Sequence, residues 1–154
     1  MERAEVVIVG GGIIGASIAY HLAKRGMKDV VLLERELFFG AESTAKCAGG
    51  IRSQFGTPIN IQLSLLSIQH FERFSEEMGL PVDFRQVGYM FMSPTPENWE
   101  RAKQVAELQR RYGVPVEALT PDRIKEMVPA IDTSDLVGAH FCGIDGLADP
   151  HGFL

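Results

Sequence analysis

Hydrophobic and polar positions change their period several times along the chain, and each change marks a predicted element. The apolar run Val6–Val9 leads directly into Gly10-Gly11-Gly12, and apolar residues then recur at helical spacing over residues 18–23 until Gly26. The run Val30–Leu33 is too uniformly apolar for a half-exposed strand, which indicates a buried strand of a parallel sheet. The opening segment therefore predicts a strand, a helix and a second strand parallel to the first.

The remaining chain predicts helices and strands of another arrangement. Threonine-proline pairs mark helix starts, because a hydroxyl can cap a helix whose first position is proline. In chain order the pattern predicts a helix over residues 57–78 closed by Gly79, a strand over Phe84–Met92, a charged helix over 97–112 anchored by Trp99, a short helix between Thr120 and Pro129, a strand over 135–141, a turn at Asp145-Gly146 and a helix start at Asp149-Pro150.

Three glycines between the first strand and the first helix fit the spacing G-x-G-x-x-G. Gly10 permits a tight turn, Gly12 lets the backbone approach a pyrophosphate, and Gly15 lets helix and strand pack closely. The free N–H groups of the helix's first turn favour a dianionic ligand, and the helix dipole adds to this preference. Glu34 ends the second strand, where its carboxylate can accept hydrogen bonds from both ribose hydroxyls and would repel a 2′-phosphate. The unit predicts a site for FAD or NAD rather than NADP.

The segment Phe38–Gln54 has the character of a functional loop, because its residues 40–52 are rich in small side chains and contain almost nothing that could form a core. Small side chains let the backbone come close to a flat ligand, and the hydroxyls of Ser43 and Thr44 can meet phosphate oxygens. Taken alone, the segment fits a solvated linker as well as a ligand-binding loop. Its position directly after the βαβ unit favours the ligand-binding loop.

Composition narrows the class of protein. The chain has 154 residues, 45% of them hydrophobic and 23% charged, and its net charge of −5 argues against nucleic acid or an anionic membrane as the main partner. Cys47 and Cys142 show neither metal-ligand spacing nor a disulfide framework, which favours the reducing cytoplasm. Glycines interrupt the apolar stretch 6–22, so it makes a poor membrane span, and no secretion signal precedes it. We expect a cytoplasmic protein with a small-molecule substrate, no metal and no membrane insertion, while a partner subunit or a homo-oligomer stays open.

Five stretches of sequence together resemble the D-amino-acid oxidase superfamily of FAD-dependent oxidoreductases. In chain order they are G-G-G-I-I-G-A-S-I-A-Y-H-L-A, V-V-L-L-E-R, S-T-A-K-C-A-G-G-I-R, V-G-Y-M-F-M-S-P and D-G-L-A-D-P-H. Within this superfamily the chain is most similar to sarcosine oxidase β subunits, proline dehydrogenase β subunits, glycine oxidase and dimethylglycine dehydrogenase. The resemblance covers essentially the whole chain, although the family's proteins are longer.

The predicted fold class is α/β, with a Rossmann-like FAD-binding βαβ unit and the first part of a mixed-sheet substrate domain, both incomplete. A dinucleotide-binding domain needs at least a third parallel strand, and the pattern offers only two. We expect residues 1–83 to be the N-terminal part of the FAD-binding domain, 84–148 part of the substrate domain, and 149–154 the start of a return to the first. We expect the chain to be an N-terminal portion that is inactive by itself.

The resemblance also implies roles for individual residues. The glycines of the motif would hold the FAD pyrophosphate, Glu34 the ribose, and Gly49-Gly50 would lie against the flavin ring. Arg52 would bind the substrate carboxylate, with a structural ion pair or a phosphate contact as the open alternative. The full set of expected cofactor-binding residues is Gly10, Gly12, Ile13, Ile14, Gly15, Glu34, Arg35, Ser43, Thr44, Ala48, Gly49 and Gly50.

The implied chemistry is oxidation of the C–N bond of an amino acid or N-methylated amine, with hydride transfer to the flavin. In dimethylglycine and sarcosine dehydrogenases a histidine two residues after the Ser-Thr pair links covalently to the flavin. Lys46 stands at that position, so we expect non-covalent FAD, and we expect Cys47 beside it to be a small packing residue. No catalytic base is identifiable. An NAD-dependent dehydrogenase and a non-catalytic flavin-fold assembly subunit remain the alternatives.

Overall fold

The computed structural model describes residues 3–154 and has a mixed α/β architecture, as predicted. The chain forms two compact units, which are described separately. The first contains the residues up to Gly49 together with Ala148–Leu154, and the second contains Gly50–Leu147. These limits differ from the predicted functional domains, which divide at residue 83. The functional division stays a prediction.

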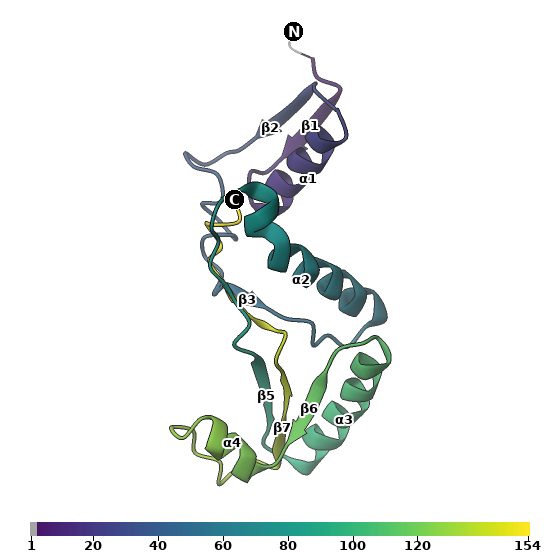
Figure 1. The fold of residues 1–154 in the computed structure, drawn as a ribbon, viewed down its shortest axis with the longest axis vertical. Helices are drawn as coiled ribbons and strands as arrows, with labels where there is room; N and C mark the ends of the chain where they lie inside the picture. The colour runs from purple at the N-terminus through teal and green to yellow at the C-terminus, as the bar shows by residue number, and fades with distance from the viewer. Residues whose placement is uncertain (1–2) are drawn as a thin grey trace. The chain divides into compact units, whose positions relative to one another are not determined.

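The first unit contains the predicted strand–helix–strand arrangement. Strand β1 (Val6–Val9), helix α1 (Ile13–Lys24) and strand β2 (Val30–Leu33) follow one another, and β1 pairs in parallel with β2. Helix α1 lies beside the two strands (Figure 1). Ile8 is buried close to Gly15 of the helix, whereas Val9 is 84% exposed. The βαβ prediction is confirmed, and one apolar face of its sheet remains uncovered.

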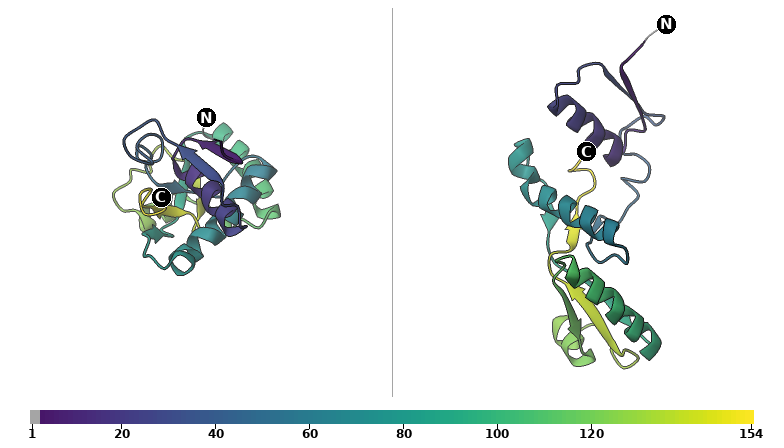
Figure 2. Two further views of the ribbon diagram at one scale, coloured as in Figure 1. Left: turned by 90° about the horizontal axis from the view of Figure 1, so that it is seen from above. Right: turned by 90° about the vertical axis from the view of Figure 1, so that its right-hand side faces the viewer.

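The second unit is built on an antiparallel sheet in the order β5-β7-β6. The central strand β7 (Gly138–Cys142) pairs with β5 (Tyr89–Ser93) and with β6 (Val116–Leu119). Helices α3 (Pro96–Arg111) and α4 (Pro121–Met127) lie on opposite sides of this sheet (Figure 2). A smaller sheet has the order β3-β8-β4, from Gly50–Ile51, Gly146–Ala148 and Phe84–Arg85.

Two hydrophobic clusters fill the second unit. The first joins α2 (Pro58–Met78), α3 and the sheet, and its buried members are Ile61, Ala106, Val114, Val116 and Cys142. The second lies under α4 and contains Leu119, Ile124 and Ala139. The predicted helices at 57–78, 97–112 and 120–129 are therefore present, and α2 ends as predicted at Gly79 with a positive φ of 68°.

Several strand limits differ from the prediction. The strand predicted over Phe84–Met92 is two strands, because the chain turns at Gly88, which has φ +83° and whose N–H donates to the Asp145 carbonyl oxygen at 2.8 Å. Strands β6 and β8 were not predicted, because each is short and is fixed by pairing with distant segments. The helix predicted at Asp149-Pro150 is a turn, in which the His151 N–H donates to Asp149 Oδ1 at 3.0 Å.

No helix within residues 3–154 is both long and apolar enough to cross a membrane. Over the same residues, no three or more His, Cys, Asp or Glu side chains gather in a group that could hold a metal ion.

Candidate cofactor site

The turn between β1 and α1 needs glycine for reasons of backbone geometry. Gly10 has a φ of +104°, and its N–H donates to the Leu33 carbonyl oxygen at 2.8 Å, which ties the turn to β2. A Cβ added at Gly15 would lie 1.9 Å from the Gly10 carbonyl oxygen, which is far too close for two atoms that are not bonded to each other. The absence of both side chains therefore lets the helix begin directly against the end of the strand.

Glu34 is bound to the same turn through its carboxylate. Its Oε2 accepts a hydrogen bond from the Gly11 N–H at 2.7 Å, and its Oε1 accepts one from the Glu36 N–H at 2.8 Å. The bonds from Glu36 and Gly11 lower the pKa of Glu34 below its ordinary value, because they stabilise the charged form. Each carboxylate oxygen accepts two hydrogen bonds, so each retains one free position. An ionised Glu34 can accept two further donors, such as the two hydroxyls of a ribose.

Thr44 caps helix α1 from a distant part of the chain. Gly12 occupies the N-cap position and has no side chain, and the Ile13 N–H instead donates to Thr44 Oγ1 at 3.0 Å. A Cβ at Gly12 would come within 3.1 Å of the same oxygen. The Thr44 hydroxyl still has its hydrogen to donate, and first-turn N–H groups such as that of Ile14 have no acceptor within the helix. Thr44 thus satisfies one N–H of the helix terminus and leaves other first-turn N–H groups without an acceptor in the helix.

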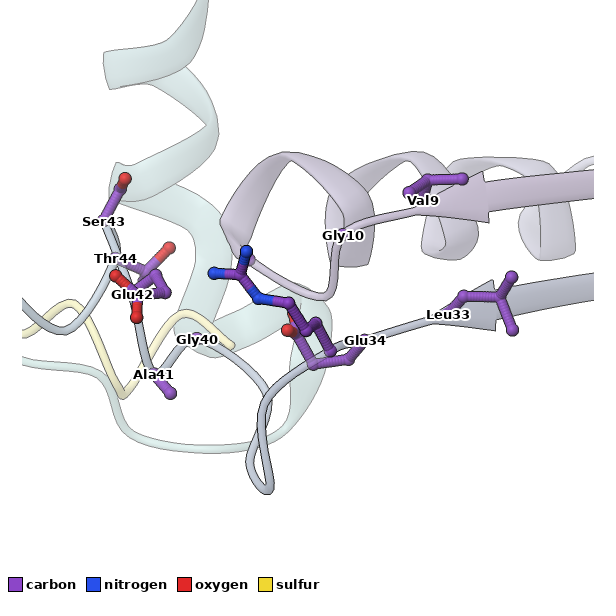
Figure 3. Close-up of a pocket in the computed structure, with 11 residues that line it drawn as sticks. Val9, Gly10, Leu33, Glu34, Gly40, Ala41, Glu42, Ser43 and Thr44 are labelled. Atoms are coloured by element: carbon purple, nitrogen blue, oxygen red, sulfur yellow. The ribbon is translucent and has the colours of Figure 1, made fainter.

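These groups surround a cavity of about 560 Å³ in the first unit. Figure 3 shows the ends of the two strands, at Val9 and Leu33, on one side and residues 40–44 on the other. The lining residues are Val9, Gly10, Gly12, Leu33, Glu34, Arg35, Gly40, Ala41, Glu42, Ser43 and Thr44. A second cavity of about 300 Å³ shares Gly10, Gly12, Ser43 and Thr44 and extends to Ile13, Ile14 and Gly15. Volumes of this size are typical of small-molecule sites.

Charged side chains at the rim are paired with each other. The Lys46 ammonium donates to Glu42 Oε2 at 2.5 Å, and this bond lowers the pKa of Glu42. Arg35 Nε donates to Glu36 Oε1 at 2.9 Å, and the Arg35 side chain is largely exposed. The negative charge of Glu42 is therefore balanced locally, which reduces its repulsion of an anion in the cavity.

Arg52 belongs to the second unit and has a different environment. Its guanidinium carbon lies 4.8 Å from the ring centre of Phe55 and 5.6 Å from that of Phe91. Within residues 3–154 no carboxylate pairs with this exposed side chain. The structural ion pair that sequence reasoning left open is thus not present in the described chain.

A profile of the family described as "DAO: FAD dependent oxidoreductase" matches residues 5–154. The chain belongs to this family of FAD-dependent oxidoreductases. It is 36% identical over 152 residues to mitochondrial dimethylglycine dehydrogenase of Rattus norvegicus, covering 97% of this chain. It is 31% identical over 145 residues to the mitochondrial pyruvate dehydrogenase phosphatase regulatory subunit of Mus musculus, covering 94% of this chain.

Among solved structures, L-proline dehydrogenase from P. horikoshii matches with a TM-score of 0.90 and 39% identity over 98% of this chain. The chain spans 39% of that protein, and 17% and 16% of the dimethylglycine dehydrogenase and the regulatory subunit. These matches confirm the predicted superfamily and its FAD dependence.

The residues of the cavity fit the family's cofactor. The glycine turn has room for a pyrophosphate against the helix terminus, where a Cβ at Gly12 would crowd Thr44. The ionised Glu34 retains acceptor positions that suit the hydroxyls of the FAD ribose. The Ser43 and Thr44 hydroxyls line the same space and can donate to phosphate oxygens.

The structure gathers most of the predicted cofactor residues in one unit. Nine of them line the two cavities: Gly10, Gly12, Ile13, Ile14, Gly15, Glu34, Arg35, Ser43 and Thr44. Ala48, Gly49 and Gly50 line neither, and their contacts with the cofactor stay predictions. Gly49 instead has φ +70° and accepts a hydrogen bond from the Ala148 N–H at 2.8 Å.

Sequence reasoning missed Gly11, whose N–H holds Glu34, and the lining residues Gly40, Ala41 and Glu42. The last three lie inside the small-residue loop that was predicted as a whole to meet the ligand. Their spacing gave no sign of which of them would line the cavity.

Proposed function

We propose that this chain forms the cofactor-binding part and a piece of the substrate-binding part of an FAD-dependent enzyme that oxidises the C–N bond of an amino acid or N-methylated amine. The observation that carries the proposal is the cavity of about 560 Å³ lined by the glycine turn, the ionised Glu34 and the Ser43-Thr44 hydroxyls. When bound, FAD supplies the redox chemistry by accepting a hydride.

The first unit binds and orients the cofactor in this proposal. The backbone at Gly10, Gly12 and Gly15 holds the pyrophosphate against the start of α1, and Glu34 accepts the ribose hydroxyls. Ser43 and Thr44 donate to the phosphates, with Ile13, Ile14 and Arg35 beside them. Ala48 and Gly49, and Gly50 at the start of the second unit, carry no bulky side chain and leave space for the flatter, flavin end of the molecule.

The second unit supplies the anchor for the substrate. Arg52 is exposed and unpaired in the described chain, and its planar guanidinium can donate two parallel hydrogen bonds to a carboxylate. An amino-acid substrate held in this way would present its amine and α-carbon in a fixed orientation. Such orientation is the protein's contribution, since it lowers the entropic cost of hydride transfer.

Non-covalent binding of FAD is supported by the surroundings of Lys46 and Cys47. The Lys46 ammonium is paired with Glu42, and the Cys47 thiol donates to the Thr44 carbonyl oxygen at 3.1 Å. Neither group is positioned as an unengaged nucleophile. We expect acid denaturation to release all the flavin into the supernatant, and protein-bound yellow colour after precipitation would contradict this.

The test of the function uses the full-length protein. We expect purified protein to show flavin absorbance, and we expect anaerobic addition of sarcosine, dimethylglycine, proline or glycine to bleach it. Bleaching reports oxidation of the substrate whatever the natural electron acceptor is. Protein that contains NAD in place of flavin, identified by mass, would overturn the proposal.

A non-catalytic role is the second candidate, because one relative carries the name of a phosphatase regulatory subunit. Flavin that no member of the amine panel bleaches would favour that role. Location in the cytoplasm, small-molecule substrates and the absence of nucleic-acid partners remain parts of the proposal, supported by the two unpaired cysteines and the net charge of −5. Partner subunits and homo-oligomers stay open.

A further inference from the structure

The Arg52 guanidinium is held in place by contacts that leave its hydrogen-bonding groups unused. Phe55 and Phe91 both lie within cation–π distance of it, at 4.8 and 5.6 Å from the guanidinium carbon to the ring centres. Neither contact is a hydrogen bond, and among residues 3–154 no acceptor bonds to the five N–H donors of Arg52, which can therefore serve another molecule. The two rings therefore orient the guanidinium without using its N–H groups, which suits a side chain that binds a carboxylate.

The backbone that carries Arg52 is fixed by a buried carboxylate. Asp145 is fully buried, and its Oδ1 accepts from the Ser53 N–H at 2.7 Å and from Ser53 Oγ at 2.6 Å. Its Oδ2 accepts from Gln54 Nε2 at 3.2 Å, and the same amide donates to the Tyr89 carbonyl oxygen at 2.9 Å. The segment after Arg52 is thus attached to strand β5. The backbone next to Arg52 is therefore held at a fixed distance from β5.

Two aromatic side chains of β5 stand next to this anchor. Tyr89 and Phe91 are two residues apart on one strand, so they share a face of the sheet. Their rings stack with centres 5.2 Å apart and planes at 29°. The Tyr89 ring also reaches Gly50, where an added Cβ would lie 3.4 Å from Tyr89 Cε2. An aromatic wall therefore extends from Gly50 through Tyr89 and Phe91 to the Arg52 guanidinium.

We propose that Tyr89 and Phe91 form an apolar wall that selects substrates by the carbon atoms next to their carboxylate. The proposal rests on the proposed role of Arg52 as the carboxylate anchor. An amino acid with ring or aliphatic carbons beyond its α-carbon covers Phe91, which is 38% exposed, whereas glycine leaves it uncovered. The preferred class is therefore an apolar or cyclic amino acid. Phe91 is the main specificity-determining residue, because its ring stacks on Tyr89 and also lies within cation–π distance of the Arg52 guanidinium.

The experiment measures binding of substrate-like acids that cannot be oxidised at a C–N bond. The full-length flavoprotein is titrated calorimetrically with acetate and with cyclopentanecarboxylate, and the ratio of the two affinities is the readout. One methylene in an apolar pocket changes discrimination about 10- to 200-fold. We expect Phe91→Ala to reduce the preference for cyclopentanecarboxylate at least about tenfold, and Phe91→Leu to reduce it less.

The matched control is Tyr112→Ala, which removes another partly exposed aromatic ring of the same unit at the end of α3. It should leave the affinity ratio unchanged. If Phe91→Ala does not retain flavin, Phe91→Leu gives the same comparison with a smaller expected change. If a Phe91 variant retains flavin and its ratio of affinities for the two acids equals that of the wild type, the proposed selectivity of the wall is rejected.

Arg52→Met separates this result from a failure of the proposed function. We expect it to weaken both acids by a similar factor, because both share the carboxylate. Unchanged binding of both acids by Arg52→Met would reject the role of Arg52 as carboxylate anchor and, with it, the selective role of Tyr89 and Phe91. Loss of both acids in Arg52→Met, combined with an unchanged ratio in the Phe91 variants, would keep the anchor and reject the wall alone.

Discussion

In the first unit the buried hydrophobic side chains of the described residues are Ile8 and Phe153, whereas both hydrophobic clusters belong to the second unit. Strand β7 of the second unit is buried on both faces, while β1 and β2 of the first expose Val9 and Leu33. The first unit is instead organised by glycine turns and by the hydrogen bonds of Glu34 and Thr44. Substitutions in the two units should therefore affect different properties of the protein.

The difference has a thermodynamic consequence. A unit held by packing loses stability when a buried methyl or methylene is removed, because a cavity remains. A unit shaped around a ligand gains stability from that ligand, and the gain grows with the logarithm of the ratio of ligand concentration to dissociation constant. We therefore expect core substitutions in the second unit to change unfolding, and turn substitutions in the first to change FAD binding.

The largest effect should come from the second unit's core. Ile61→Ala removes a fully buried side chain of α2 and should destabilise the protein by about 2–5 kcal/mol. Ile59→Ala, in the same helix but 59% exposed, should stay within about 0.5 kcal/mol. Chemical denaturation of the full-length protein, with FAD in excess, measures both. Equal losses in the two variants would contradict packing as the basis of this unit.

The glycine turn should give the next largest effect, on cofactor affinity. In Gly15→Ala the added Cβ would lie 1.9 Å from the Gly10 carbonyl oxygen, so the helix must move away from the strand. We expect FAD affinity to fall at least about 100-fold, the equivalent of about 3 kcal/mol of overpacking. Gly56→Ala is the control, since a Cβ there meets no atom within 4 Å and the φ of Gly56 is not positive. Flavin content after gel filtration measures the difference, and wild-type content in Gly15→Ala would reject the explanation.

The same contrast explains what the sequence could predict. Strand β1, the glycine turn and α1 follow from neighbouring residues, because the period and the glycine spacing are local signals. The positions of Thr44 and Asp145 were not predictable in this way. Thr44 was predicted to meet phosphate and also caps α1 from 31 residues away, and Asp145 was predicted only as part of a turn. The bonds of Asp145 to Ser53 join residues 92 positions apart in the sequence, and hydrophobic periodicity cannot predict such a pairing.

Short strands were missed for a related reason. Strand β6 has four residues and β8 has three, and each is defined by partners on β7 or β3 rather than by its own composition. The predicted strand is interrupted at Gly88, where the chain turns with φ +83° and the N–H donates to the Asp145 carbonyl oxygen, a bond to a segment 57 positions away in the sequence. Local composition thus predicted the cofactor turn better than it predicted the sheet of the second unit.

A moderate effect on cofactor binding is expected at Glu34. In Glu34→Gln one carboxylate oxygen becomes an NH₂ group facing a backbone N–H, and the charge is lost, so FAD affinity should fall about 10- to 100-fold. Glu36→Gln removes only an exposed pair with Arg35 and should change affinity less than about threefold. Fluorescence titration with FAD measures both. A Glu34→Gln variant that binds like Glu36→Gln would show that the carboxylate is not a cofactor contact.

The pH dependence of this binding has a definite sign. The pKa of Glu34 is lower in the folded protein than in the unfolded chain, because the Glu36 and Gly11 N–H groups bond to the charged form. Glu34 therefore stays ionised in the folded protein at and above its ordinary pKa of 4.5, and its contribution to FAD binding should be lost only as pH falls through the lower folded value. FAD affinity of the wild type should therefore be constant from neutral pH to about 5, and Glu34→Gln should show no decline below that.

The smallest effect concerns His140, in the core of the second unit. The ring is 4% exposed, stacks on Trp99 with centres 4.7 Å apart, and has no hydrogen-bond partner for either nitrogen within the described residues. Burial lowers the pKa of His140, and the nearby charges of Arg110 and Lys103 lower it further. A histidine kept neutral in the folded state binds fewer protons than in the unfolded chain. Stability should therefore decrease as pH falls below the unfolded pKa of about 6.5.

His140→Phe keeps an aromatic ring against Trp99 and removes the titrating group. The thermal midpoint of the wild type should fall more between pH 7 and pH 5 than that of His140→Phe, by a few degrees for an effect of about 1 kcal/mol. Ile59→Ala is the control, because it changes an exposed side chain of α2 that carries no titratable group. It should keep the wild-type slope. Identical slopes for wild type and His140→Phe would show that His140 is protonated in the folded protein, and that the packed unit tolerates a charge in its core.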